Sequence, residues 1–580
     1  MAITSEIKQH GGVPTLFVNG LPHPGLAYVT YLPERADYDN MARLGCNLYS
    51  VCLYFASRPV NAAELCGPFA KGIYEDRENP DFSIVDTEFQ RLLNACPNAL
   101  IFPRVNLNLP SWWEAEHPEA MNDVGVNGHA PRPCVASPVW RETVANWLVR
   151  LIEYIENSPW ADHIIGYQLA GGQTEEWMSI DMNGCRGEAL RKAFAKDCPN
   201  GTDTDFRVYS SLTNVQAIEF FAQTAKQALH GKKVIGAFYG YTFETPWWQQ
   251  AHAAITELLV GTGVDFLCSP LSYNHLRPSG IDLACMTVLD TVKRHGRLYF
   301  AEADVRTCNT LPLCQSRPGI CAPEHYSGGL WAGPKDPWVC RHQLRSVFGR
   351  MLTHGNALWW FDMWGGWYDH PDFRTEFAQF FALAEQALTD TQRGSIARLA
   401  VFIDEKACAC TEEQDSTATT IASENRIPLG HSGVPYDVFE ISDFDGVFAE
   451  RLPDGTPRYT AAVFLIPHST QAMTYALSKW KEGGRPMLTA DHNAPLLTPH
   501  SIHTLCQDSG IHCWAAPGDV LYASAHWVVL HAATAGEKTI YLPDTAQIRE
   551  VCASADSPTF SASHITLSMK QYETRLFRIN

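Results

Sequence analysis

The amino-acid sequence predicts an α/β protein in three parts: a (β/α)8 barrel, a small doubly wound α/β domain and a small C-terminal antiparallel β domain. Three observations lead to this prediction. The chain has 580 residues, more than one hydrophobic core usually supports. Short apolar runs alternate with amphipathic stretches as far as about residue 390. Beyond that point the pattern changes twice.

The barrel is predicted from eight pairs of a β-rich apolar run and a helical stretch, because eight such pairs close a barrel. Helices are expected at 142–156 and 214–229, where apolar residues recur at three- and four-residue steps. Long connections rich in Trp, Tyr, Gly and Pro follow the strands, and a barrel carries its chemistry on such loops. The predicted strands are 25–30, 47–54, 99–106, 163–169, 233–239, 265–269, 297–301 and 357–361.

The two changes of pattern predict two further domains. Residues 397–405 (ARLAVFIDE) open a second series of strands and helices, without the GxGxxG motif of a dinucleotide site. After about residue 510, alternating apolar and polar residues predict antiparallel strands. The predicted limits are 1–392 for the barrel, 393–510 for the α/β domain and 511–580 for the β domain.

Composition argues against several classes of partner. The formal net charge is −19 and no run of Lys and Arg stands out, so we expect no nucleic-acid binding. There is no signal-like start and no stretch of about 18 apolar residues, which predicts a cytoplasmic protein without membrane contact. The 18 cysteines contain no CxxC pair, so we expect mostly buried free thiols. A structural metal in the loop 308–321 stays open.

Acidic residues directly follow two of the predicted strands. The fourth strand runs into YQLAGGQTEEW, which contains Glu175 and Glu176, and the seventh runs into LYFAEADVRT, which contains Glu302. Hydrolysis of a glycoside with retention needs two carboxyl groups about 5–5.5 Å apart, one ionised and one protonated. The tips of these two strands face each other across a barrel, so the sequence predicts this chemistry with Glu302 as the nucleophile.

The acid/base is expected to be Glu176, with Glu175 as the alternative. Trp177 follows Glu176, and its bulk would exclude water and raise the pKa of that acid. Glu302 ends its strand, so the sheet would hold it rigidly for covalent attack.

Other strand tips supply residues that suit a sugar. We expect Arg104 either to keep the pKa of Glu302 low or to form a salt bridge inside the barrel. At the end of the eighth strand and just after it, Trp360, Trp364 or Trp367 would stack on a sugar ring. The full set of predicted substrate-binding residues outside the acids is Arg104, Asn106, Gln173, Tyr241, Tyr273, Trp360 and Trp364.

With these motifs in place, the whole chain resembles the family-42 β-galactosidases and their relatives in a large clan of retaining TIM-barrel glycoside hydrolases. The resemblance implies a barrel, an α/β trimerisation domain and a small β domain, in that order, and hence a homotrimer. It also implies Glu302 as nucleophile and an acid/base within GGQTEEW. The clan usually has an Asn-Glu pair there, so we expect Gln173 to hold the sugar 2-hydroxyl in place of that Asn.

The predicted function is therefore an exo-acting retaining β-glycosidase on an oligosaccharide or glycoside, most closely a β-galactosidase. A two-carboxylate mechanism needs neither a cofactor nor a metal. The alternatives are a β-mannosidase or another β-glycosidase of the clan, a catalytically silent carbohydrate-binding barrel, and a barrel lyase or metal-dependent isomerase. The last would need His, Asp and Glu at several strand tips, where this sequence offers Trp, Tyr and isolated Glu.

Overall fold

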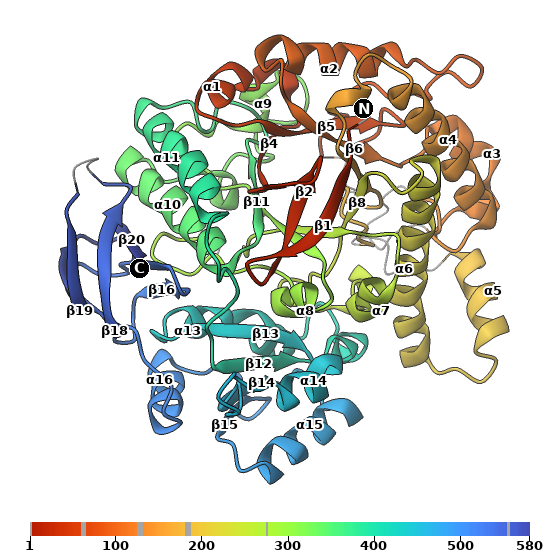
Figure 1. Ribbon diagram of the computed structural model, residues 1–580. Coiled ribbons are helices and arrows are strands. Elements are labelled where there is room, and N and C mark those ends of the chain that lie inside the picture. The colour runs from red at the N-terminus through yellow and green to blue at the C-terminus, as the bar shows by residue number, and fades with distance from the viewer. Residues whose placement is uncertain (1–2, 60–64, 124–131, 180–186, 274–276, 554–556) are drawn as a thin grey trace.

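A computed structural model describes residues 3–59, 65–123, 132–179, 187–273, 277–553 and 557–580. Eight parallel strands close a barrel in the order β10-β11-β4-β5-β6-β7-β8-β9 (Figure 1). All eight predicted strands are present, with ends that differ by a few residues. The strands are β4 (Leu26–Val29), β5 (Leu48–Tyr54), β6 (Leu100–Asn106), β7 (Gly166–Ala170), β8 (Val234–Phe238), β9 (Phe266–Pro270), β10 (Leu298–Ala303) and β11 (Ala357–Phe361).

Helices connect the barrel strands. Both predicted helices exist but begin earlier, because caps lie upstream: Ser137 caps α4, and Thr202 forms a capping box with Asp205 at the start of α6. The helices of this part are α1 (Tyr38–Arg43), α2 (Ser83–Ala95), α3 (Ser111–Glu116), α4 (Pro138–Glu156), α5 (Glu188–Asp197), α6 (Asp203–Ala228), α7 (Ile255–Val260), α8 (Leu289–Arg294), α9 (Leu313–Ser316), α10 (Pro337–His354) and α11 (Pro371–Ala387).

Aromatic rings fill one layer of the barrel interior. Phe300 lies 5.9 Å from Phe102, 5.2 Å from Phe266 and 5.1 Å from Trp359, measured between ring centroids. The layer needs a residue without a side chain on β8, because a Cβ on Gly236 would lie 2.0 Å from the Phe266 ring. Side chains two residues further along each strand face the same way and lie nearer the carboxyl end. This layer is therefore the floor of the barrel mouth.

A three-stranded antiparallel sheet, which the sequence analysis did not predict, precedes the barrel. Its strands are β1 (Ser5–His10), β2 (Val13–Val18) and β3 (Leu21–His23). The turns carry Gly11-Gly12 and Asn19-Gly20, all with positive φ, the pattern that two-residue hairpin turns require. The Ser5 hydroxyl donates to the Ile165 carbonyl and accepts from the Val234 amide, so the sheet lies at the amino ends of β7 and β8.

After the barrel, four parallel strands form a sheet in the order β13-β12-β14-β15. Side chains of β12 alternate between two cores: Leu399 and Val401 face the core shared with the barrel, whereas Phe402 packs with Phe444 and Trp480 on the other face. The elements are β12 (Leu399–Ile403), β13 (Tyr436–Glu440), β14 (Ala461–Leu465), β15 (Met487–Ala490), α12 (Ser416–Thr419), α13 (Arg426–Gly430), α14 (Phe444–Ala449), α15 (Gln471–Glu482) and α16 (Pro499–Asp508).

The C-terminal strands form an antiparallel sheet in the order β16-β17-β20-β18-β19, drawn in blue in Figure 1. The Thr574 amide donates to His342 Nδ1 over 2.9 Å, which joins this sheet to α10. The strands are β16 (Val520–Ala523), β17 (Trp527–His531), β18 (Gly536–Val551), β19 (Thr559–Met569) and β20 (Thr574–Ile579). The predicted fold class is thus confirmed, while the predicted domain limits stay a prediction.

Within the described residues, no helix combines the length and the apolar character needed to cross a membrane.

We predict that Gly236→Ala destabilises the protein by about 1–3 kcal/mol, because the added methyl group overpacks the aromatic layer. Gly328→Ala is the matched control: its Cβ meets nothing within 4 Å and its φ of −151° suits alanine. Urea unfolding followed by tryptophan fluorescence measures both. Equal unfolding midpoints for the two variants would show that the aromatic layer accommodates the added methyl group without a loss of stability.

Candidate active site

A cavity of about 130 Å³ lies at the carboxyl end of the barrel strands. Two carboxylates line it together: Glu176 from the loop after β7 and Glu302 from β10. The structure therefore brings together the two acids that the sequence analysis selected. The other lining residues are Tyr31, Cys66, Phe69, Thr174, Tyr273, Leu313, Tyr326, Trp331, Phe361, Met363 and Trp364.

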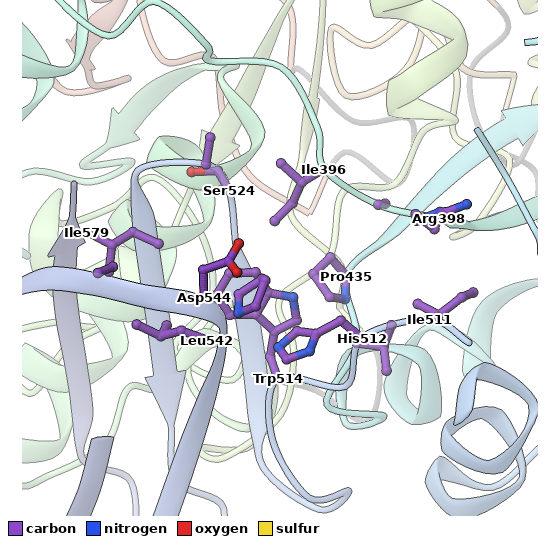
Figure 2. A pocket seen from close by; sticks show the side chains of 15 residues that line it. Ile396, Arg398, Pro435, Ile511, His512, Trp514, Ser524, Leu542, Asp544 and Ile579 are labelled. Atoms are coloured by element: carbon purple, nitrogen blue, oxygen red, sulfur yellow. The ribbon is translucent and has the colours of Figure 1, made fainter. Parts of the chain in front are cut away.

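A larger cavity of about 400 Å³ lies between the α/β sheet and the C-terminal sheet (Figure 2). Its walls are mainly apolar, with Ile396 and Leu542 among them, and the ring of His512 meets Trp514 edge-on. Asp544 is the single carboxylate among its described lining residues. Because hydrolysis by two carboxyl groups needs a pair, the barrel cavity is the candidate active site.

Arg104 on β6 and Glu302 on β10 lie in the layer above the aromatic floor. Glu302 Oε2 is 3.3 Å from Arg104 Nη1, and both side chains are almost completely buried. Arg104 Nη2 donates to the Tyr31 hydroxyl over 3.1 Å, and its guanidinium lies 4.4 Å from the centroid of the Phe238 ring. The predicted contact between Arg104 and Glu302 is thus present, with Tyr31 as a partner that the sequence analysis missed.

Glu175 does not line the cavity. Its Oε2 is 3.0 Å from Arg104 Nε, and its Oε1 accepts a hydrogen bond from Asn106 Nδ2 over 3.1 Å. Asn106 Oδ1 in turn accepts from the Asn108 amide over 3.0 Å. The polar groups of Asn106 are therefore engaged inside the protein, and Glu175 is held against the same guanidinium as Glu302.

Glu176 lies in a short loop that is held by two backbone hydrogen bonds within the loop. The Gln173 amide donates to the Met178 carbonyl over 3.0 Å, and the Trp177 amide donates to the Gly171 carbonyl over 2.8 Å. Glu176 Oε1 accepts a hydrogen bond from the Tyr241 hydroxyl over 2.7 Å. Tyr241, predicted as a substrate-binding residue, thus contacts the predicted acid directly.

The same loop has an unusual backbone, which Trp177 anchors. Thr174, Glu175 and Trp177 have φ values of 56°, 68° and 60°, in the left-handed region that residues other than glycine seldom adopt. Such conformations cost free energy and persist where the surrounding structure holds them. Trp177 is buried, and its Nε1 donates to the Leu169 carbonyl over 3.0 Å.

Burial raises the pKa of both carboxyl groups in the cavity. It raises the pKa of Glu176 to about 7, although the hydroxyls of Thr174 and Tyr241 lower it. It raises the pKa of Glu302 to about 8, against the lowering effect of Arg104, and the charge of Glu176 adds to the rise. The prediction that Arg104 keeps the pKa of Glu302 low is therefore wrong in its net direction. The loss of solvation outweighs the guanidinium, so the pair retains a proton near neutral pH.

Asp304 forms a second buried charge cluster beside the cavity. Arg277 and Arg306 each place a guanidinium nitrogen 2.5 Å from its carboxylate, and the Tyr273 hydroxyl donates to it over 2.7 Å. Burial raises the pKa of Asp304, but the two arginines outweigh burial and hold it below its usual range. The negative charge of Asp304 in turn raises the pKa of Glu176. Asp304 lies two residues after Glu302 and was not among the predicted site residues.

Aromatic rings form one wall of the cavity. Trp364, predicted from the loop after the eighth strand, stacks on Trp331 with ring centroids 5.4 Å apart, and Tyr326 meets Trp331 edge-on at 4.8 Å. Trp331 and Tyr326 come from the connection after β10. They were not predicted, because they lie neither in a periodic apolar pattern nor at the end of a strand.

Trp360 lies outside the cavity, contrary to the prediction that it stacks on a sugar. Its ring packs on Phe377 and Phe380 of α11, at centroid distances of 4.9 and 5.7 Å. Successive side chains of a barrel strand alternate between the interior and the helices, and on β11 it is Trp359 that faces inward. The prediction identified the correct strand but chose the residue that faces the helices instead of its inward-facing neighbour.

Gln173 is buried, and its side-chain amide has no hydrogen-bond partner among the described residues. It does not line the cavity as the structure stands. The cysteines of the loop 308–321 are free, and no group of three metal-binding side chains is found there within the described part of the chain.

Comparison with known proteins gives matches in structure only. No family model matches the sequence, and no curated protein matches it. A β-galactosidase from Bacillus circulans sp. alkalophilus superposes with a TM-score of 0.60 at 10% identity, over 96% of this chain and 99% of that one.

Two further solved structures are similar. A β-galactosidase from the psychrophilic Marinomonas ef1 has a TM-score of 0.60 at 12% identity, over 96% of this chain and 100% of that one. An exo-carrageenase of family 42 from Bacteroides ovatus has a TM-score of 0.58 at 12% identity, over 100% of this chain and 86% of that one. The chain therefore has the fold of the family-42 glycoside hydrolases over nearly its whole length, as the resemblance in sequence motifs implied.

Proposed function

We propose that this protein is a retaining exo-β-glycosidase that hydrolyses terminal β-galactosides. The observation that carries the proposal is that Glu176 and Glu302 line one cavity at the mouth of the barrel. Solved β-galactosidases with the same fold support it. The exo-carrageenase has this fold too, so the likeness alone does not choose the sugar. β-Mannosidase, another β-glycosidase activity and a catalytically silent carbohydrate-binding barrel are the alternatives.

In the proposed mechanism Glu176 and Glu302 share one proton and have different roles. In the cavity Glu302 has the higher pKa of the two, so the shared proton must pass to Glu176 before attack; Arg104 beside Glu302 stabilises the negative charge that then forms there. Glu302 attacks the anomeric carbon while Glu176 protonates the leaving oxygen, so a covalent glycosyl-enzyme forms. Glu176 then takes a proton from the water that releases the sugar. Tyr241 orients Glu176 through its hydrogen bond in both steps.

Glu175 is assigned a positioning role rather than the role of acid/base. Its carboxylate is buried against Arg104 and Asn106 and does not line the cavity. Exo action is supported by the small volume of the cavity, about 130 Å³, and by the aromatic wall of Trp331 and Trp364. Trp364, Tyr273 and Tyr241 are the proposed sugar-binding residues from the predicted set. The cytoplasmic location and the lack of a cofactor stay predictions.

The first test is a panel of aryl β-glycosides of galactose, mannose, glucose, fucose and arabinopyranose. We expect the galactoside to be hydrolysed with the highest kcat/KM, measured by release of the aryl group, and Glu302→Ala to hydrolyse none of them. A preference for the mannoside would move the assignment to that sugar. Sugar binding in calorimetry without any hydrolysis would favour the catalytically silent barrel.

The roles of the acids are separable by rescue with azide. Glu302→Ala should lose turnover by several orders of magnitude and yield an α-glycosyl azide, because azide replaces the nucleophile. Glu176→Ala should keep activity on substrates with good leaving groups and yield a β-glycosyl azide, because only acid and base assistance is lost. Product configuration by NMR distinguishes the two.

The matched control for this experiment is Glu175→Ala, which removes the neighbouring carboxylate. It should give no azide adduct, whatever its effect on rate. A β-glycosyl azide from Glu175→Ala and none from Glu176→Ala would transfer the acid/base role to Glu175. No adduct from any of the three variants would refute the double displacement.

We also propose a homotrimer, because the α/β sheet follows the barrel in the order that the family resemblance implies for a trimerisation domain. The absence of a GxGxxG motif in its sequence leaves that sheet without a dinucleotide-binding role. Light scattering coupled to size exclusion should give a mass three times the 64.6 kDa of the chain. A mass equal to that of one chain, at micromolar concentration, would contradict this proposal.

A further inference from the structure

The carboxyl edge of the α/β sheet has the geometry of a ligand site. In the strand order β13-β12-β14-β15, the chain passes from β12 to β13 on one side and then to β14 on the other. Open parallel sheets bind their ligands outside the carboxyl ends of the strands where the order reverses in this way. Here that position lies beyond the ends of β12 and β14 (Figure 1).

Three metal-binding side chains meet at this edge from separate loops. Asp415 lies in the connection after β12, His468 follows β14 and His492 follows β15. One ligand atom of each residue lies within 4.8 Å of the others. We propose that Asp415, His468 and His492 bind a divalent metal ion of the zinc type.

Asp415 and His492 each have one side-chain atom bonded to the backbone and a second atom available to a metal. Asp415 Oδ1 accepts from the Ala418 amide over 2.9 Å, which leaves Oδ2 for the metal. His492 Nε2 lies 2.6 Å from the Pro467 carbonyl oxygen. A carbonyl only accepts, so His492 donates through Nε2 and its Nδ1 carries the lone pair. Orientation of a histidine ligand by a backbone carbonyl is usual at metal sites.

His468 supplies the most direct sign of a missing partner. Its Nε2 is buried and makes no hydrogen bond in the described part of the chain. Asp415 Oδ2 is 3.5 Å away, too far for a well-formed hydrogen bond. A buried polar nitrogen held only by such a long contact costs free energy, and a metal ion between His468 and Asp415 would remove this cost.

Chemistry and spacing select the class of metal. Two imidazoles and one carboxylate suit zinc and its neighbours, whereas magnesium and calcium prefer oxygen ligands. Ligands about 2.0–2.1 Å from a tetrahedral zinc lie roughly 3.3 Å apart. The 3.5 Å between His468 and Asp415 is close to this spacing. His492 is exposed, so its ring can move toward the ion, and water would occupy the fourth position.

The metal would join three loops of the α/β sheet, so its expected effect is on stability. The site belongs to a different sheet from Glu176 and Glu302 and has no part in the proposed hydrolysis.

The test compares zinc content across variants, because the 18 cysteines of the chain also offer zinc ligands. After treatment with chelator and dialysis against micromolar zinc, wild type should retain one more zinc per chain than His468→Ala or His492→Ala, by mass spectrometry of the metal. His500→Ala, which removes an exposed histidine from α16, should retain as much as wild type. Zinc should raise the melting temperature of wild type and of His500→Ala only.

A cobalt spectrum identifies the ligands. The difference between wild type and His468→Ala should show visible d–d bands without a thiolate charge-transfer band in the near ultraviolet. Equal zinc content in wild type and variants, or a thiolate band in that difference, would overturn the proposal. If His468→Ala does not fold, Asp415→Asn is nearly isosteric and decides the same question through zinc content.

Discussion

The guanidinium of Arg104 lies inside the barrel with only 1% of its side chain exposed, and the rest of the site is arranged around this charge. An unpaired charge at such depth would cost several kcal/mol, so it requires carboxylates within contact distance. Glu175 and Glu302 both fill that need. One positive charge thus faces two carboxylates, with Glu176 close by as a third acid. The excess of negative charge, together with burial, keeps a proton in the cavity near neutral pH.

The position of Arg104 depends in turn on the layer beneath it. Phe102 and Phe300 lie two residues before Arg104 and Glu302 on their strands, so the rings and the charged groups face the same way in successive layers. The rings exclude water from below the ion pair. They fit because Gly236 leaves space on β8. The packing of the aromatic layer therefore helps to determine where Arg104 and Glu302 lie at the mouth of the barrel.

Much of this arrangement could be predicted from the sequence, and the failures have physical causes. Strands buried on both faces read as apolar runs, which is why all eight were predicted and why Glu302, directly at a strand end, was identified. Periodicity does not reveal which of two adjacent residues faces inward, so Trp360 was chosen where Trp359 faces the interior. Tyr31 and Trp331 reach the cavity from loops distant in sequence, and only tertiary structure brings them there.

The two acids are held by different means, and the difference fits the tasks proposed for them. Glu302 is part of a strand bonded to neighbours on both sides, so its carboxylate has little freedom. Glu176 stands on a loop with three left-handed residues, whose conformational cost is offset by the burial of Trp177 and its hydrogen bond to Leu169. A nucleophile must meet one carbon atom in a fixed direction. A proton donor that also serves water tolerates a looser support, provided that an anchor such as Trp177 keeps it within hydrogen-bond reach.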